Sequence, residues 1–175
     1  MKGSPENSVD GIIRSLGLVR HPEGGYFREV FRSPIPIPPT LLPSERCYPE
    51  KRSLATVIHF LLPRGDVSHF HRLRSDEIWF HHRGSPVRIH ALPTGEDSSV
   101  KMVLDGLDQP HHLIPAGTWF AAEVEPGPEP FALCSCLVAP GFDFSDFELA
   151  EAENLSGAYP EHSALIKRLC PKRPS

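Results

Sequence analysis

Prolines are spread so densely along this chain that long helices have little room to form. Twenty of the 175 residues are proline, against a usual share of ~5%, and each proline inside a helix would remove a backbone hydrogen bond. Short alternating or apolar runs recur between the prolines at intervals of roughly ten residues. The sequence therefore predicts an all-β domain in which about eight to ten short strands form a jelly roll or a barrel.

Residues 68–84 (SHFHRLRSDEIWFHHRG) are the most informative stretch and hold four of the ten histidines. Successive side chains of a strand point to opposite faces, so His69 and His71 are expected to share one face. Residues 72–75 are expected to turn the chain back on itself. The segment that follows the turn would then lie beside the first as an antiparallel partner.

In that second segment, Glu77, Trp79 and His81 are expected to share a face by the same alternation. Asp76 would point the other way, so only one of the two carboxylates can face inward, and we favour Glu77. If the turn brings the two faces together, two imidazoles and a carboxylate converge on one spot. Such a group is typical of a metal site or of an acid–base site.

The chain as a whole is interpreted as one domain, residues 1–175, without repeats. Ser4 followed by Pro5 predicts the start of a helix, and Gly17 predicts its end. The expected segments are, in order, a helix over about 5–16, a Pro-rich loop or arm at 33–50, a β-barrel over about 51–139, and a tail at 140–175 that packs on the outside and contains a short helix at 160–169.

Two segments bear on assembly. Residues 53–62 (SLATVIHFLL) are apolar on both faces and predict a central strand, although one barrel interior cannot bury both faces. The Pro-rich segment 33–50, with six prolines, is a surface loop, an arm long enough to reach a neighbouring subunit, or a lid over the pocket. Together these features predict a homodimer.

Charge and composition argue against several partners. The net charge of −4 offers no basic surface for nucleic acid. No stretch approaches the ~18 apolar residues of a membrane span, and the start, MKGSPENSVDG, lacks the apolar core of a signal peptide. Cys134 and Cys136 lie two apart on one run, which is poor geometry for a disulfide. We therefore expect reduced thiols, a cytoplasmic location and a small-molecule ligand.

Four strings occur in an order that resembles a known family: PEGGYFREVF, HFHRLRSDEIWFHHRGSP, IPAGTWFAA and VAPGFDFSDFELA. They are similar to the uncharacterised cupin 5 group of the cupin superfamily, over about residues 13–169. The resemblance implies a double-stranded β-helix, the RmlC-like cupin jelly roll, with short helices only near the two ends.

The first cupin motif resembles His69-x-His71 with Glu77, residues that in cupins point into the barrel mouth and often hold a divalent metal. The second motif, which often adds a third histidine, resembles Pro-Ala-Gly at 115–117, but Phe120 stands where that histidine is expected. A metal would then have only His69, His71 and one carboxylate. No cofactor is therefore the first expectation, and a divalent transition metal is the alternative.

PEGGYFREVF also resembles a segment that reads roughly DERGFFLETF in the dTDP-sugar 3,5-epimerases, cupin-fold enzymes that bind a nucleotide sugar. The two strings coincide at Glu23, Gly25, Phe27, Glu29 and Phe31. The arginine of that segment falls on Gly24, so one contact to phosphate or sugar is missing. The likeness implies a nucleotide or a nucleotide sugar as the first candidate ligand.

Three functions stay open at this stage. The first is a metal-independent isomerase or epimerase, with His69 and His71 as acid–base groups and Tyr26 as an acid. The second is a metal-dependent cupin enzyme, an oxygenase or an isomerase, that uses His69, His71 and Glu77. The third is a binding module without catalysis, since a fold alone does not determine a function.

The expected ligand is a small, anionic, ring-bearing molecule in the mouth of the barrel. We expect its ring to stack on Trp79 and Phe120. We expect its anionic group to bind Arg28, Arg72 or Arg74. The other ligand-binding candidates are Glu23, Glu77 and His81.

Overall fold

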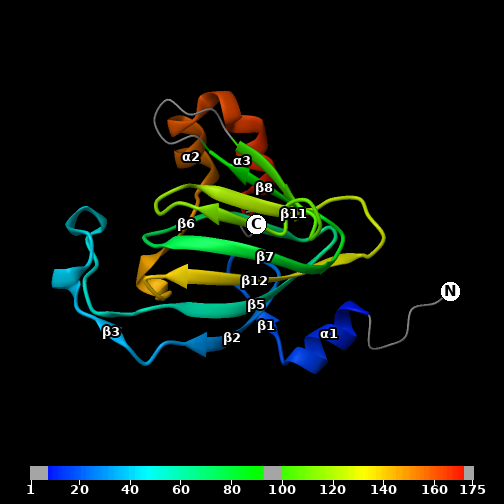
Figure 1. The fold of residues 1–175 in the computed structure, drawn as a ribbon. Coiled ribbons are helices and arrows are strands. Elements are labelled where there is room, and N and C mark those ends of the chain that lie inside the picture. The colour runs from blue at the N-terminus through cyan, green and yellow to red at the C-terminus, as the bar shows by residue number, and fades with distance from the viewer. Residues whose placement is uncertain (1–7, 93–99, 172–175) are drawn as a thin grey trace.

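Two antiparallel β-sheets face each other in the structure, a computed structural model that describes residues 8–92 and 100–171 (Figure 1). The six-stranded sheet has the order β1-β2-β5-β12-β7-β10, and the five-stranded sheet has the order β13-β6-β11-β8-β9. A two-stranded ribbon, β3-β4, lies beside them. The predicted all-β jelly roll is confirmed.

The bounds of the strands follow from their backbone pairing. The six-stranded sheet contains β1 (Val19–Arg20), β2 (Tyr26–Arg32), β5 (Thr56–Pro63), β12 (Phe131–Ala139), β7 (Asp76–Gly84) and β10 (His111–Ile114). The five-stranded sheet contains β13 (Phe147–Leu149), β6 (Val67–Leu73), β11 (Phe120–Val124), β8 (Val87–Ala91) and β9 (Val100–Leu104). The ribbon pairs β3 (Pro36–Ile37) with β4 (Arg52–Ser53).

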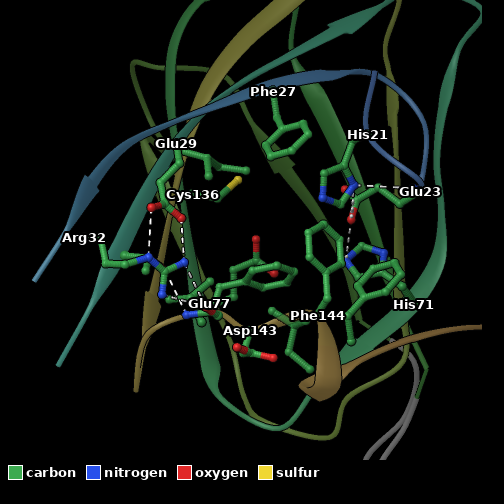
Figure 2. Close-up of a pocket in the computed structure, with 16 residues that line it drawn as sticks. His21, Glu23, Phe27, Glu29, Arg32, His71, Glu77, Cys136, Asp143 and Phe144 are labelled. Atoms are coloured by element: carbon green, nitrogen blue, oxygen red, sulfur yellow. Dashed lines mark hydrogen bonds and ion pairs between the residues drawn. The ribbon is translucent and has the colours of Figure 1, made fainter. Parts of the chain in front are cut away.

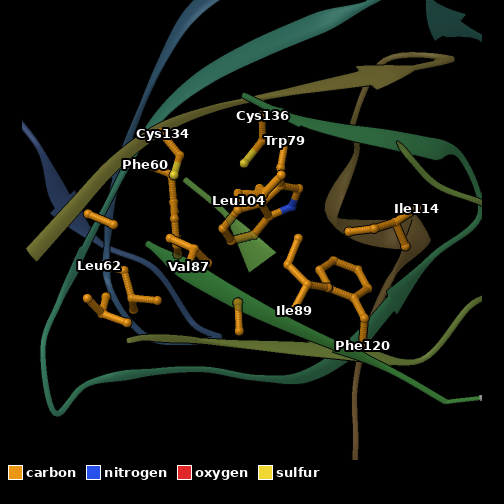
Figure 3. Packing of buried hydrophobic residues seen from close by; sticks show 13 residues of the cluster. Phe60, Leu62, Trp79, Val87, Ile89, Leu104, Ile114, Phe120, Cys134 and Cys136 are labelled. Atoms are coloured by element: carbon orange, nitrogen blue, oxygen red, sulfur yellow. The ribbon is translucent and has the colours of Figure 1, made fainter. Parts of the chain in front are cut away.

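The main apolar core lies between the two large sheets (Figure 3). Phe60 of β5, Trp79 of β7 and Phe120 of β11 meet there, with ring centroids 5.2 Å apart for the first pair and 6.3 Å for the second. Ile89 and Leu104 fill the space beside them. Burial of each such side chain contributes roughly 1.5–3 kcal/mol, so this cluster holds the sheets together.

The central position predicted for residues 53–62 is confirmed, because β5 lies between β2 and β12. Its inward side chains Phe60 and Leu62 join the main core, while Leu61 packs with residues of α1 on the outer face. All four cysteines are free thiols, and Cys134 and Cys136 are buried. The predicted reduced state of these two thiols agrees with the structure.

Short helices cover parts of the outside. The N-terminal helix α1 (Val9–Leu16) ends at Gly17, which has a φ of 61°, as predicted. It begins later than expected because Ser8 is extended and its side chain caps the Gly11 N–H at 3.0 Å; residues 5–7 lie outside the described part. No helix in the described part of the chain is long and apolar enough to cross a membrane.

Two C-terminal helices, α2 (Ala152–Ala158) and α3 (Ser163–Leu169), cover the outer face of the five-stranded sheet (Figure 1). Phe70 of β6 and Ala121 of β11 pack there against Ile166 and Leu169. The predicted terminal helix is α3, which follows a 3-10 turn at residues 160–162. The sequence patterns did not reveal α2.

The barrel is larger than the predicted range of 51–139, because β2 precedes this range and β13 follows it. The tail does not simply pack on the outside: β13 pairs with β6, and Phe147 lies opposite Leu73. The Pro-rich segment 33–50 lies at the end of the barrel where β6 turns into β7, and Tyr48 hydrogen-bonds to Arg74 and Ser75 there. None of its residues lines the cavity described below. Its interpretation as a lid is therefore wrong, and its reach to a neighbouring subunit stays a prediction.

Candidate functional site

A cavity of about 200 Å³ lies between the sheets, at the end of the barrel where β6 ends and β7 begins. Both large sheets contribute to its walls. Figure 2 shows His21, Glu23 and His71 on one side of the cavity and Glu29 with Arg32 on the opposite side. The two sides therefore differ, with histidines against a carboxylate on one and an arginine ion pair on the other.

A β-bulge in β6 determines which histidine reaches this cavity. His71 lies opposite Phe120 of β11, but Ser68 lies opposite Ala122, so β6 has one extra residue between these pairs. Ser68 and His71 therefore both face inward although they are three positions apart. His69 faces outward, and its Nδ1 donates to a backbone carbonyl of α3 at 3.1 Å. The prediction that His69 and His71 share a face is wrong for this reason.

The Glu23 carboxylate is the centre of the inner wall. It accepts a hydrogen bond from the Ser68 hydroxyl at 2.9 Å. Its Oε2 lies 3.2 Å from Nε2 of His71 and 3.3 Å from Nδ1 of His21. All four side chains are buried, so this carboxylate is surrounded by hydrogen-bonding groups rather than by water.

A tight turn at residues 21–25 holds Glu23 in place. Gly24 donates its N–H to the His21 carbonyl at 3.0 Å and has a φ of 109°. A Cβ at Gly24 would lie 2.0 Å from the Val67 carbonyl oxygen of β6. The arginine of the epimerase segment therefore has no room here, and glycine lets the turn lie directly on β6.

Glu23 and His71 form a buried pair that can take up a proton. The Nδ1 of His71 lies 2.8 Å from the His69 carbonyl, which can only accept, so Nδ1 carries hydrogen. The Nε2 then faces a carboxylate oxygen of Glu23 at 3.2 Å, so the contact between these two atoms is where the pair can hold a proton that it accepts. Burial would raise the pKa of Glu23, but the charge of His71 and hydrogen bonds from His21 and Ser68 lower it. Burial in turn lowers the pKa of His71, and the Glu23 charge offsets part of that effect.

Glu77 of β7 lines the same cavity, but it is protonated whereas Glu23 is ionised. Burial, with the charge of Glu23, raises the pKa of Glu77 to about 8. The side chain is therefore protonated at neutral pH. Its Oε2 is buried and has no hydrogen-bond partner among the described residues. The cavity is thus lined by an ionised carboxylate, Glu23, and by a neutral carboxylic acid, Glu77.

Arg32 closes the opposite side of the cavity. Its guanidinium donates to both carboxylate oxygens of Glu29, at 2.9 and 2.7 Å. It also donates to the Phe142 carbonyl at 3.1 Å, while the Phe142 N–H donates to the Thr56 hydroxyl at 2.9 Å. These bonds tie residue 142 to the last residue of β2 and the first residue of β5.

Residues 142–147 form the mouth of the cavity, which corrects the expectation of a tail on the outside. Hydrogen bonds from Ser145 lower the pKa of Asp143, so its carboxylate is ionised at neutral pH. Phe144 is 55% exposed, and its ring is stacked 6.2 Å from that of His21. The mouth is therefore an aromatic and acidic rim.

The family model of the Cupin superfamily (DUF985) matches residues 10–150. This chain belongs to that family. The uncharacterised protein YML079W of Saccharomyces cerevisiae is 30% identical over 158 residues, which cover 86% of this chain and 79% of the yeast protein.

Two solved structures are similar along nearly their whole length. A hypothetical protein from Leishmania major has a TM-score of 0.85 and 31% identity, covering 95% of this chain and 100% of its own. Protein SO0799 from Shewanella oneidensis has a TM-score of 0.80 and 36% identity, covering 94% and 98%. None of the three names states an activity, so the chemistry of this cupin rests on its cavity.

Of the residues predicted as catalytic in this cupin, only His71 lines the cavity. His69 faces α3 instead. Tyr26 belongs to the cluster next to α1, and the Arg20 guanidinium lies 4.2 Å from its ring centroid. Arg28 also points to α1, where it donates to a backbone carbonyl at 3.1 Å. The structure thus places Tyr26 and Arg28 away from the site.

Three residues predicted to contact the ligand point into the barrel as expected, but they lie deeper than the cavity. Trp79, 1% exposed, and Phe120 are part of the main core, so neither offers a ring face to a ligand. Phe120 instead supports His71, with ring centroids 4.2 Å apart. His81 lies toward the other end of β7, where its Nε2 is 3.0 Å from the Ser85 carbonyl. The predicted stacking on Trp79 and Phe120 is wrong.

The other predicted arginines line a groove outside the cavity. Arg72 pairs with Glu148 at 2.6 Å and lies 4.6 Å from the ring centroid of Trp119. Arg74 donates to the Cys47 carbonyl at 2.5 Å. Both side chains are therefore engaged in surface contacts and do not reach a ligand in the cavity.

The metal set suggested by the first cupin motif does not assemble. The bulge turns His69 away, so His71 and Glu77 lack their third ligand. Within residues 8–92 and 100–171, no three His, Cys, Asp or Glu side chains are arranged to hold a metal ion. The residues present do not fit the metal that the motif implies.

Sequence patterns missed most of the residues that line the cavity, among them His21, Arg32, Asp143 and Phe144. Strict alternation from Phe27 and Glu29 would place residue 31, not residue 32, in the cavity. A second bulge, between residues 29 and 31, shifts Arg32 onto the inner face. His21 could have been found from its place at the start of the PEGG turn.

Proposed function

We propose that this cupin binds a small ring-bearing ligand in the cavity and catalyses a metal-independent isomerisation or epimerisation beside a carbonyl group. One observation carries the proposal: two carboxyl groups in one cavity have pKa values moved in opposite directions. Glu23 is ionised beside His71, while Glu77 is protonated at neutral pH. Pairs of this kind supply a base and an acid at the same pH.

The proposed step needs no oxidant or reductant. The Glu23–His71 pair accepts a proton from the carbon beside the carbonyl, and the electron pair of that C–H bond moves toward the carbonyl oxygen. Glu77 donates its proton to this oxygen, which gives an enol. For the epimer, the Glu23–His71 pair returns its proton to the same carbon from the other face of the enol, and the enol proton goes back to Glu77. For the isomer, the pair returns its proton to the former carbonyl carbon, and the hydroxyl on the neighbouring carbon gives its proton to Glu77. Either route restores the enzyme.

The first candidate ligand is a nucleotide or a nucleotide sugar, with its ring-bearing end in the cavity. Support comes from the likeness of residues 22–31 to the epimerase segment and from the position of Glu23 and Phe27 on the cavity wall. Phe144 and Phe147 add aromatic faces at the mouth. Arg28, Arg72 and Arg74 no longer support this ligand, because they lie elsewhere.

Exchange of hydrogen with solvent tests the proposal directly. Free and nucleotide-linked keto sugars are incubated with the protein in D₂O, and deuterium uptake at carbon is followed by NMR and mass spectrometry. We expect uptake with at least one of them, and a loss of about 10²–10⁴-fold in His71→Asn. His69→Asn is the matched control and keeps the rate, because His69 faces α3.

Three results of this experiment contradict the proposed catalysis. Binding without any exchange favours the binding module, and exchange that His71→Asn leaves unchanged places the chemistry on other residues. Exchange that depends on added divalent metal favours the metal-dependent alternative.

We also propose a homodimer that joins the outer faces of two six-stranded sheets. An apolar row crosses that face through five strands in register: Phe31, Val57, Leu137, Ile78 and Leu113. Phe31 is 50% and Leu113 is 48% exposed. Light scattering should give twice the mass of one chain at micromolar concentration, and Ile78→Glu should give a single chain. A single-chain mass for the unaltered protein contradicts the proposal.

A further inference from the structure

We infer that the part of the ligand inside the cavity is an uncharged ring with an oxygen acceptor, held by Glu77 as hydrogen-bond donor, and that anionic groups stay outside. This inference rests on the proposed function and specifies the class of ligand for the same site. It changes the expectation from the sequence, in which an anion enters the barrel mouth.

The first support is the unpartnered acid. Glu77 is 6% exposed, lines the cavity, and leaves Oε2 without a hydrogen-bond partner among the described residues. The polar groups beside it, the Trp79 indole N–H and the Cys136 thiol, are donors. A protonated carboxyl group needs an acceptor for its own hydrogen, and leaving it without one is costly. A ligand oxygen is the group that the cavity lacks.

The second support is the charge of the walls. Glu23, Glu29 and Asp143 line the cavity together with Glu77, whereas Arg32 is the single arginine or lysine among the lining residues. That arginine is already bonded to Glu29 and to a backbone carbonyl. A carboxylate or phosphate inside would therefore face more negative than positive charge in a poorly hydrated space, and like charges there repel strongly.

The third support is size. The cavity has a volume of about 200 Å³. That volume holds one six-membered ring with small substituents and is below the ~300–1,000 Å³ of sites for larger ligands. A diphosphate and a base attached to such a ring must therefore extend past Phe144 into solvent.

A matched pair of fragments tests the inference. Tetrahydropyran-4-one and tetrahydropyran-4-carboxylate have the same ring, but the first is neutral with an oxygen acceptor and the second is an anion. Each is titrated at pH 7 into isotopically labelled protein, and the NMR signals of cavity residues are followed. We expect the ketone to shift these signals and the carboxylate to bind at least about tenfold more weakly.

Variants at Glu77 test the assigned donor. Glu77→Gln keeps a donor of the same size and should hold the ketone within about twofold. Glu77→Met has a similar volume without a donor and should lose about tenfold, the usual scale of one hydrogen bond. Glu148→Gln, in the outer groove, is the control and should bind as the unaltered protein does. Urea denaturation of each variant verifies that it is folded.

The outcomes separate this inference from the proposed function. Equal or tighter binding of the carboxylate overturns the inference and leaves a catalytic cavity possible for anions. Unchanged ketone affinity in a folded Glu77→Met protein overturns the role of Glu77. Absence of any shift with either fragment, together with absence of deuterium exchange, overturns the proposed function as well.

Discussion

The two ends of the barrel interior are built from the same strands but differ in chemistry. Along the inward face of β7, Glu77 lines the cavity, Trp79 lies in the apolar core, and His81 lies against a backbone carbonyl beyond it. Glu77 and Trp79 are both almost fully buried. Burial alone therefore does not distinguish a site from a core; what matters is whether a hollow lies beside the side chain.

The core and the cavity also differ in how they contribute to the stability of the fold. In the core, Trp79 and Phe60 gain stability from contact with other apolar groups. At the cavity, Glu23, His71 and Glu77 are removed from water, which costs stability unless every polar atom finds a partner. We expect changes in the core to weaken the fold through lost apolar contacts. We expect changes at the cavity to strengthen or weaken it according to whether a buried polar group is removed or loses its partner. Four predictions test this contrast, from the largest effect to the smallest.

The largest effect should come from Glu77. Its pKa is about 8 in the folded protein, against 4.5 as the ordinary value. The folded state then holds a proton that the unfolded state has lost, so stability is greatest below pH 4.5 and falls as pH rises toward 8. At about 1.4 kcal/mol per pKa unit, the contribution of this group spans at most about 5 kcal/mol.

Urea denaturation of unaltered protein and of Glu77→Gln at several pH values measures this effect. The variant has no proton to lose at this position. The difference between its free energy of unfolding and that of the unaltered protein should therefore grow in its favour between pH 5 and pH 8. Glu148→Gln, which is exposed, is the control and should show no such trend. Parallel curves for Glu77→Gln and unaltered protein would contradict the assigned protonation.

The second prediction concerns the core. Trp79→Ala should lower the free energy of unfolding by about 3–5 kcal/mol, the range for a large aromatic residue removed from a packed interior. Trp119→Ala is the natural control, since Trp119 is half-buried below Arg72 on the other side of the sheet. Its cost should be clearly smaller. Equal costs would show that the core is not concentrated between the sheets.

The third prediction concerns the hydrogen bond that the Ser68 hydroxyl donates to Glu23. Ser68→Ala removes the hydroxyl that donates to Glu23 at 2.9 Å inside the protein, and loss of one partner of a buried acceptor costs about 1–3 kcal/mol. It should also raise the pKa of Glu23, because one stabilising hydrogen bond is lost. The free energy of unfolding and the carboxyl ¹³C shift of Glu23 against pH measure the two effects. No change in either would mean that His21 and His71 suffice.

Much of the fold could be predicted from the sequence, because alternation and proline spacing are local signals. The inward face of Glu77, Trp79 and His81 was predicted correctly, since β7 is regular over these residues. The position of His69 was not, because one extra residue in β6 reverses the alternation. A bulge depends on pairing with β11, and no local pattern near residue 69 reveals it.

The sequence also did not show how deep in the barrel each inward-facing side chain lies. Alternation shows that Trp79 and Phe120 point inward, but it does not show whether they meet a ligand or each other. The answer depends on residues 142–147 and on the turn at 21–25, which bring Phe144 and Glu23 to one end of the barrel. These contacts join segments more than a hundred residues apart, and physical reasoning on single segments does not reach them.

The smallest effect on stability should come from Phe144, at the mouth. Its side chain is 55% exposed, so Phe144→Ala should change the free energy of unfolding by no more than about 0.5 kcal/mol. Its ring nevertheless lies over His21 with centroids 6.2 Å apart, and a ligand leaving the cavity must pass it. The same variant should therefore weaken binding of a ring-bearing ligand by about 0.5–1.5 kcal/mol, the range of one aromatic contact.

Ketone titration and urea denaturation of this variant and of Leu107→Ala, an exposed residue away from the cavity, separate the two effects. A large loss of stability, or no loss of binding, would mean that Phe144 is part of the core rather than of the site.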